Sequence, residues 1–445
     1  MSAGNATIES LLSERPICPF QIFVAVLCGL SVLLDGISTQ LIGYAAPAIS
    51  KNLHLAHGQI SAAFAAGLFG LMVGGLLCSL LADLTGRRRL LIASTLIFGV
   101  FTVATGFAAS LHQLVIWRFV AGLGLGGAMP IAIALTAEVS PSRARGAMVL
   151  MMFCGFPLGG ALAGILAWAI LPRGGWHALF FAAGAMSLVL SLVLLVALPE
   201  SLLFLVNQGA SAARTKRLQQ RLAPGSEHVT LIRADPAGRY RVPLTGLFID
   251  GRALGTVLIW IIYFMSLLDI YFLASWLPTV LSLNSAAGQS SIIGTSMMQL
   301  GGAAGTLILG LFLDRLNPYW TLFLTYLGAT VFIGTVGVVT PGGWLVAVLF
   351  AAGFFLISAQ SGLHALVSAI YPTSARATGL GWGLSIGRIG SIVGPVVGGV
   401  LLTTHWDVRS MFFLVAAPTL IAAITVPVMA GARPRTSAKG VDTHD

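Results

Sequence analysis

Four ionisable residues lie inside long apolar stretches of this sequence, where a charge is costly. Asp35 interrupts the run VLCGLSVLLDGISTQLIGYAAPAI (residues 26–49), and Arg118, Asp269 and Arg388 interrupt later runs. A helix rises about 1.5 Å per residue, so each run can cross the roughly 30 Å hydrocarbon core of a bilayer. A charge at that depth costs on the order of 3 kcal/mol, and such residues usually face a polar cavity and bind a substrate or a proton.

The types of these residues indicate proton and anion chemistry. Asp35 and Arg118 fall at compatible depths, so we expect them to face one cavity and to form an ion pair. Burial favours the neutral carboxyl group and a nearby cation favours the carboxylate, so a pair whose contact changes can load and release a proton. A fixed structural ion pair is the alternative. Arg388 lies near the bilayer midplane, where its planar guanidinium suits a carboxylate. That carboxylate belongs either to a substrate or to Asp269.

Further substrate contacts are predicted from polar and aromatic side chains within the spans. Gln360, Ser361 and His364 are spaced i, i+1 and i+4 and share one helix face, where they could reach a phenolic hydroxyl or a second carboxylate. Hydrogen bonding between helices is the alternative. Candidate partners for an aromatic ring, although aromatic residues at helical spacing more often face lipid or the core, are Tyr44, Phe69, Tyr263, Phe264, Tyr271 and Trp382.

Clusters of opposite charge fall at the predicted cytoplasmic ends of the spans. An exposed ion pair contributes only about 0–1 kcal/mol, so a network is needed to bias a conformational change. We expect these clusters to act as a gate that locks the two halves in the outward-open state and parts when the cytoplasmic side opens. They are Asp83 with Arg87, Arg88 and Arg89, then Glu138 with Arg143 and Arg145, and Asp314 with Arg315.

The composition places the whole chain in a membrane. Of its 445 residues, 57% are hydrophobic and 9% are charged, whereas soluble domains are about one quarter charged. The first apolar run is too long for a cleavable signal peptide. The four cysteines lack the spacing of a metal-binding motif, so we expect them to be small packing residues. Twelve apolar spans are predicted, at about 19–47, 57–82, 90–110, 113–137, 147–171, 176–198, 253–280, 289–313, 319–340, 343–370, 377–403 and 408–431.

The distribution of Lys and Arg predicts the orientation of these spans. If the N-terminus is cytoplasmic, inside segments hold 19 of the 24 Lys and Arg residues and outside loops hold three. This bias is the positive-inside pattern, and it predicts that both termini are cytoplasmic. The net charge of +10 then follows from topology, so no nucleic-acid partner is expected.

The chain divides into two similar halves, which is typical of transporters. We predict a six-helix bundle over residues 1–198, a cytoplasmic connector over 199–252, and a second six-helix bundle with a short tail over 253–445. LADLTGRRR follows the second span and LFLDRLNP follows the eighth, at equivalent positions. In the connector, RTKRLQQRL is either a helix on the anionic leaflet or a solvated linker. GLGLGG, at 122–127, lies inside a span and indicates close helix packing instead of nucleotide binding.

Several of these segments resemble the motifs of a known family. LADLTGRRR, WRFVAGLGLGG, GFPLGG and LPES resemble signatures of the major facilitator superfamily, although Ser79 replaces a usual glycine. DGIST, LTAEVSPSRARG, YFLASWLP, AQSGLHAL and YPTSARATGLGWGLSIGRIGSIVGP resemble the aromatic acid:proton symporter family within it. The first-helix motif of that family usually has a second acid where this chain has Ser38, followed by Thr39. Either the ligand is bound differently, or another acid such as Asp269 takes that role.

The resemblance implies an all-α, multi-pass transporter of the bacterial inner membrane, and no cofactor. Its substrate would be a small aromatic, hydroxybenzoate-type carboxylic acid carried inward with protons by alternating access, and related sugar symporters of the superfamily use a similar Asp–Arg pair. The protein is expected to be a monomer. Export of such acids or of drugs, and symport of a non-aromatic acid, are the alternatives. A membrane sensor is less favoured because no signalling domain is appended, and no nucleophile–base grouping indicates an enzyme.

Overall fold

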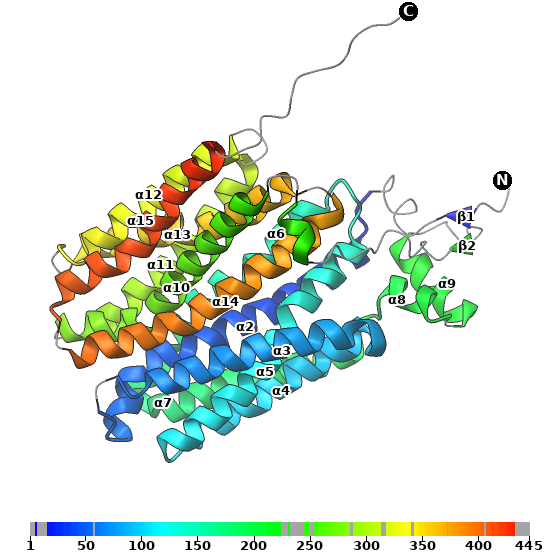
Figure 1. Cartoon of the computed structure of the whole chain (residues 1–445). Coiled ribbons are helices and arrows are strands. Elements are labelled where there is room, and N and C mark those ends of the chain that lie inside the picture. Colours follow the sequence, from blue (N-terminus) through cyan, green and yellow to red (C-terminus); the bar gives the residue numbers. More distant parts are fainter. Residues whose placement is uncertain are drawn as a thin grey trace, which may run out of the picture.

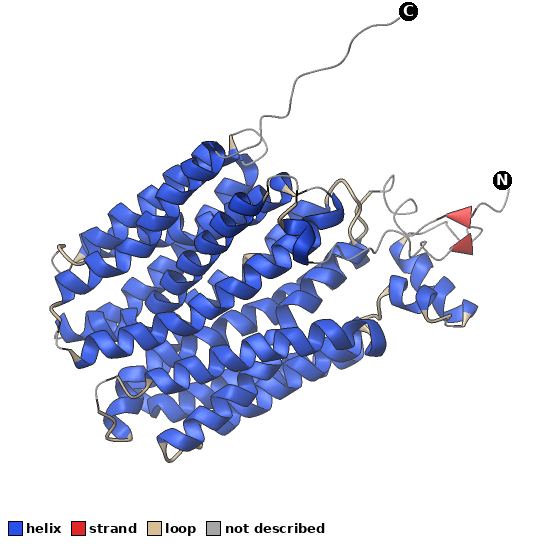
Figure 2. Ribbon diagram, viewed as in Figure 1, coloured by secondary structure: helices blue, strands red, loops and turns tan. Residues whose placement is uncertain are grey.

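The molecule is built almost entirely of α-helices, as Figure 2 shows. The structure is a computed structural model that describes residues 5–6, 16–56, 58–209, 211–223, 230–231, 244–249, 252–284, 288–312, 317–339, 342–371, 373–404 and 406–431. The described strands are β1 (Asn5–Ala6) and β2 (Thr230–Leu231), which pair in parallel. Everything that positions the candidate site is helical.

The first half of the chain forms one group of packed helices, coloured blue to green in Figure 1. Within it α3 packs on α5, α2 packs on α7, and α4 packs on both α5 and α7. The helices are α2 (Pro19–Asn52), α3 (Ser61–Thr85), α4 (Arg87–Thr105), α5 (Leu111–Val139), α6 (Arg145–Phe153) and α7 (Gly155–Ala197).

The second half forms a similar group, coloured green to red in Figure 1. Here α11 packs on α13, α10 packs on α14, and α12 packs on α13 and α15. These helices are α10 (Ala253–Asn284), α11 (Gly288–Phe312), α12 (Pro318–Val336), α13 (Gly343–Ile370), α14 (Thr373–Thr403) and α15 (Val408–Gly431). Between the halves lie α8 (Leu202–Asn207), α9 (Ala212–Leu222) and the 3-10 turn η2 (Leu244–Leu247).

Within the described residues, eleven helical stretches are long and apolar enough to cross a membrane. The sequence-based prediction of an all-helical, multi-span membrane protein is therefore confirmed. One stretch, Arg145–Ala197, is 53 residues long, more than twice the roughly 20 residues that one crossing needs. Gly175 within it has φ of 67°, a left-handed conformation that glycine adopts easily, and Pro172 lies three residues earlier.

Small residues let the helices approach closely. A Cβ atom on Gly122 of α5 would overlap the carbonyl oxygen of Gly67 on α3, and one on Gly126 would overlap that of Leu71. The backbones of α3 and α5 are therefore in contact, as small residues allow between membrane helices. The expected role of GLGLGG in helix packing is confirmed.

The two halves touch at the end of the molecule that lies away from α8 and α9. Gly58, with φ of 83°, lies just before α3, and a Cβ atom on it would come within 2.5 Å of the carbonyl oxygen of Gly399 on α14. Nearby, the ring of Phe64 on α3 meets Trp276 on α10 edge to face, with centroids 5.2 Å apart. This end is closed by backbone and aromatic contacts in the present conformation.

Candidate functional site

Asp35 lies in the middle of α2, where that helix packs against α10 of the other half. Its carboxyl group is 2% exposed and accepts a hydrogen bond of 3.1 Å from the hydroxyl of Thr39, one turn further along. The i, i+4 spacing puts both side chains on one face of the helix. The predicted acid is therefore buried at the boundary between the halves, with a polar neighbour on its own helix.

Arg118 reaches the same region from α5. Its side chain is 4% exposed, and its Nη2 donates a 3.3 Å hydrogen bond to the backbone carbonyl of Ser38. Its Nε and Nη1 have no hydrogen-bond partner among the described residues. The ion pair that we expected between Arg118 and Asp35 is not formed in this conformation, because the guanidinium bonds to the backbone of α2 beside that carboxyl group.

Arg388 approaches from α14 in the second half. Its Nη1 donates a 3.2 Å hydrogen bond to the phenol oxygen of Tyr271 on α10, and its positive charge acts on the carboxyl group of Asp35. The alternative ion pair between Arg388 and Asp269 is not formed either. Arg388 thus belongs to the centre of the molecule, together with Asp35 and Arg118.

A small cavity of about 20 Å³ lies beside Arg118 and Thr39, between the two halves, and neither Asp35 nor Arg388 lines it. This is the space of about one water molecule. Thr39, Arg118, Tyr271 and Ser275 supply polar groups, and the remaining lining is apolar, from Ile42, Phe64, Gly67, Leu68, Leu71, Leu125 and Ala274. Ser275 was missed from the sequence, although its i+4 spacing from Tyr271 places both on one face of α10.

Asp269 lies in a different place, inside the second half. It is fully buried, and neither carboxyl oxygen has a hydrogen-bond partner of normal geometry among the described residues. The polar groups close to it are the backbone of Thr419 on α15 and the phenol of Tyr326 on α12. Asp269 does not line the central cavity in this conformation, so its predicted share in proton coupling stays a prediction.

The polar face of α13 also points into the second half. Gln360 accepts a 2.9 Å hydrogen bond from Ser266, and the Nδ1 of His364 lies 2.7 Å from the phenol oxygen of Tyr263, both on α10. Ser361 is half-buried between them. Hydrogen bonding between helices, the alternative left open from the sequence, is what Gln360 and His364 do in this conformation.

Other predicted binding residues lie away from the central cavity. The hydroxyl of Ser38 bonds to Thr102 at 3.1 Å inside the first half, and Tyr44 lies 3.4 Å from Ser296 across the halves. Phe69 is 46% exposed and stacks on Phe119 on the outer surface. Two more predicted ring partners also point elsewhere: Trp382 is 40% exposed beside Trp260, and Phe264 is half-buried where α10 passes Gly390.

The charged cluster at the α8 end forms a connected network. Arg87 at the start of α4 pairs with Glu138 at the end of α5, with 3.2 Å between Nε and Oε1, and Ser201 donates to the same carboxylate. Glu200 accepts 3.0 Å hydrogen bonds from the backbone N–H groups of Arg88 and Ser201. This network joins α4 and α5 of the first half to the start of α8 in the connector, whereas we expected such pairs to lock the two halves together.

The remaining gate candidates are only partly described. Arg89 and Arg143 are exposed, and Arg145 is half-buried at the start of α6. Asp83 lies in α3, but its side chain is outside the described residues, as are Asp314 and Arg315 entirely. Their part in gating stays a prediction.

A double-mutant cycle tests the gate network. Glu138→Gln and Arg87→Met are each expected to lower the stability of the purified protein by roughly 2 kcal/mol, because each leaves a partly buried charge without its partner. The double variant should lose less than the sum of the two, because the pair is then removed together. The apparent melting temperatures of the unmodified protein, the two single variants and the double variant are measured in detergent. Strictly additive losses would contradict a coupled pair.

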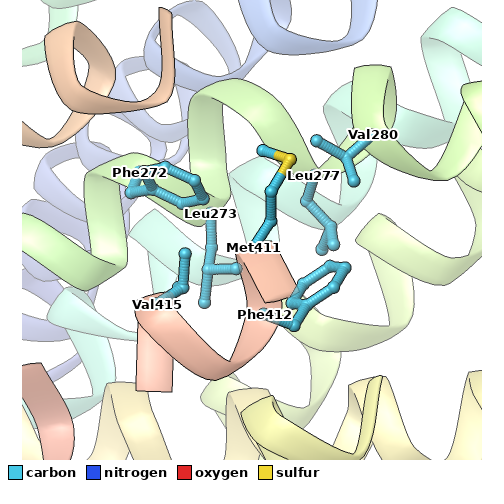
Figure 3. Close-up of a pocket in the computed structure, with 7 residues that line it drawn as sticks. All are labelled: Phe272, Leu273, Leu277, Val280, Met411, Phe412 and Val415. Atoms are coloured by element: carbon cyan, nitrogen blue, oxygen red, sulfur yellow. The ribbon is translucent and has the colours of Figure 1, made fainter. Parts of the chain in front are cut away.

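One further cavity is too small and too apolar to bind a substrate. Figure 3 shows it between α10 and α15, with a volume of about 10 Å³ and seven apolar side chains around it. Phe272, Leu273 and Leu277 of α10 face Met411, Phe412 and Val415 of α15. It is a packing void inside the second half, and the central cavity remains the candidate site.

Comparison with known proteins identifies the family. The profile described as Major Facilitator Superfamily matches residues 28–255 and 259–444, which is most of the chain. The 4-hydroxybenzoate transporter PcaK of Acinetobacter baylyi is 35% identical over 425 residues, covering 94% of this chain and 93% of that protein. A gallate transporter of Pseudomonas putida is 33% identical, covering 96% of each chain.

A solved structure shows the same fold. The partially occluded, inward-open form of the xylose transporter XylE from Escherichia coli superposes with a TM-score of 0.73, over 93% of this chain and all of that one. The two sequences are 16% identical, so the likeness concerns the fold alone.

Proposed function

Because this chain belongs to the major facilitator superfamily, we propose that it imports a small aromatic, hydroxybenzoate-type carboxylic acid together with protons across the bacterial inner membrane. The relatives reported above, which match almost its full length, are named for 4-hydroxybenzoate and gallate, both aromatic carboxylates. Alternating access of a central site between two bundles is the mechanism of this fold class.

The charge balance at the centre carries the proposal. Two cations and one acid lie near the boundary of the halves. Arg388 acts on the carboxyl group of Asp35, and Arg118 bonds to the backbone of Ser38, so the region holds one excess positive charge when all three side chains are ionised. Within the part of the chain that the structure describes, the Nε and Nη1 of Arg118 are buried and have no hydrogen-bond partner. A buried cation needs an anion, and a guanidinium binds a carboxylate through two parallel hydrogen bonds. The carboxylate of the proposed substrate would supply that anion and fill those positions.

Asp35 and the substrate carboxylate would compete for the same cations, and this competition would couple transport of the acid to transport of the proton. In the empty protein the ionised Asp35 offsets one of the two guanidinium charges. A proton on Asp35 removes that charge, and the substrate carboxylate then takes its place beside Arg118 and Arg388. One proton and one carboxylate together add no net charge to the site. The loaded and the empty protein therefore change between the outward-open and inward-open conformations at a similar electrostatic cost.

The remaining predicted contacts complete the proposal. Tyr271 and Ser275 line the central cavity with apolar side chains, a lining suited to an aromatic ring with a hydroxyl group. Gln360, Ser361 and His364 would be reached only if α13 moves relative to the cavity. Asp269 is the candidate for a second protonated carboxyl group, taking the place of the acid that Ser38 replaces.

The topology we propose has twelve crossings, with bundles at 1–198 and 253–445, a cytoplasmic connector at 199–252 and both termini cytoplasmic. A continuous α7 of 43 residues would be about 65 Å long, twice the thickness of the hydrocarbon core, and Gly175 offers a turn between two crossings. The positive-inside bias supports the orientation. We also propose that the transporter works as a monomer.

Reconstituted vesicles test the function. With the interior one pH unit above the exterior, we expect labelled 4-hydroxybenzoate to accumulate up to about tenfold for one proton per acid, because one pH unit supplies about 1.4 kcal/mol. A protonophore should abolish the accumulation, and benzoic acid analogues without the carboxyl group should not compete. Equal uptake with and without the proton gradient would contradict coupling.

A further inference from the structure

A second polar cavity, of about 270 Å³, lies at the α8–α9 end of the first half, away from the central site. Three arginines contribute to its lining, Arg88 from α4 and Arg217 and Arg221 from α9, together with Glu200, Leu205 and Leu218. Three guanidinium groups face one carboxylate, so the cavity carries two excess positive charges. Such a charge balance favours an anion.

The hydrogen bonds leave these arginines available to a ligand. Glu200 already accepts from the backbone N–H groups of Arg88 and Ser201, which occupies one of its carboxylate oxygens within the protein. The Nε of Arg88 is buried and has no hydrogen-bond partner among the described residues, while its Nη2 donates to the carbonyl of Leu195. Arg217 and Arg221 lie on the exposed side of α9. The cavity therefore holds a buried, unpartnered donor and two accessible cations.

Most of the contacts that hold the helix α9 in place do not use those cations. Leu218 and Leu222 are buried beneath it, and Gln21 of α2 donates to the carbonyl of Leu222 at 3.4 Å. The thiol of Cys18 approaches the same carbonyl at 3.6 Å, and the guanidinium of Arg221 lies 5.5 Å above the ring of Phe20. The basic segment of the connector is thus a preformed helix docked on the start of α2.

The surface next to the cavity identifies the source of the anion. The last turns of α7 expose apolar side chains, with Leu192 at 64%, Leu195 at 53% and Val196 at 87%. In a membrane these side chains face lipid tails, and the carbonyl of Leu195 bonds to Arg88 of the cavity. A soluble anion would use only the arginines. A phospholipid would use the arginines and the adjoining apolar strip.

We propose that the cavity between Arg88, Arg217 and Arg221 binds the phosphate headgroup of an anionic phospholipid, with an acyl chain along Leu192, Leu195 and Val196. Basic pockets at the membrane boundary bind such headgroups in this way. The bound lipid would tie the connector helix α9 to the start of α4, next to the ion pair of Arg87 and Glu138, and would thereby stabilise this end of the first half.

Lipid titration of the purified full-length protein tests the site. Phosphatidylglycerol is added in detergent, and binding is measured by native mass spectrometry and by the rise in apparent melting temperature. The double variant Arg217→Gln/Arg221→Gln is expected to weaken this binding roughly 25-fold, because each basic residue near an anionic headgroup contributes about fivefold. Both side chains are exposed, so the fold should be retained.

The control is Lys51→Gln/Lys216→Gln, which removes the same charge from two exposed positions outside the cavity, one of them on α9 itself. It should bind phosphatidylglycerol within about twofold of the unmodified protein. Phosphatidylcholine, inorganic phosphate and the headgroup alone, glycerophosphoglycerol, should stabilise none of the three proteins. An equal loss in the control, unchanged binding by the arginine variant, or equal stabilisation by inorganic phosphate would overturn the proposal. None of these readouts depends on transport.

Discussion

Replacing Asp35 by asparagine is expected to abolish concentrative uptake while leaving exchange of the acid across the membrane intact. Asparagine is close in size to aspartate but carries no charge, so it mimics the protonated residue permanently. The arginines then stay available to the substrate carboxylate, and the loaded protein can still change conformation. The accumulation ratio under a proton gradient should fall from about tenfold to about one.

The measurement compares two assays in the same vesicles, accumulation driven by a pH gradient and exchange of labelled for unlabelled acid. Asp407→Asn is the matched control, because Asp407 is exposed at the start of α15, outside the spans, and should leave both assays unchanged. The same change at Asp269 decides whether the second buried acid shares the role. Retained concentrative uptake by Asp35→Asn would remove Asp35 from the coupling step.

Replacing Arg118 by alanine is expected to weaken binding of the acid at least about 100-fold. Each charge-assisted hydrogen bond to a carboxylate contributes roughly 1.5–3 kcal/mol, and a bidentate contact loses two of them. Arg118→Lys keeps the charge but loses the planar pair of donors, so it should weaken binding only about tenfold. Comparison of the alanine and lysine variants separates the contribution of the positive charge from that of the planar pair of N–H donors.

Isothermal titration or ligand-induced thermal shift of the detergent-purified protein measures both variants, since a ligand that binds the folded form raises its stability. Arg409→Ala serves as the control, because Arg409 is exposed over the ring of Phe413 and does not line the central cavity. It should bind the acid normally. Unchanged binding by Arg118→Ala would show that the substrate carboxylate is held elsewhere.

The sequence predicted which charged residues belong to the site better than it predicted which of them contact one another. The intramembrane charges Asp35, Arg118 and Arg388 were identifiable because a charge stands out in an apolar run, and the structure brings all three to the boundary between the halves. Asp269 gave the same sequence signal but lies inside the second half. Hydropathy reports depth along a helix and is insensitive to which side of the helix a residue occupies.

The aromatic residues were the hardest to assign. Phe69 and Trp382 lie on exposed surfaces and Tyr263 bonds to His364 inside the second half, while Tyr271 lines the cavity. Nearly every face of these helices is apolar, because one side meets lipid and the other meets protein. A helix of this kind has too weak a polar face for spacing alone to indicate its orientation.

Which residues of the gate network pair with each other also could not be predicted without the tertiary structure. Arg87 and Glu138 are 51 positions apart and meet because α4 packs beside α5. Charge clustering at helix ends predicted that they would take part in a network. Whether that network lies within one half or between the two depends on how the helices are arranged, which no local pattern contains.

The contact of Gly58 with Gly399 has a consequence for how this end of the molecule separates. Two backbones without side chains meet there, and Phe64 and Trp276 add only ring contact, so parting this end breaks mainly dispersion contacts. Separation there should be easily reversed. A single methyl group at either glycine would clash with the opposite half and prevent this end from closing. The transporter would then be held in conformations in which this end is open.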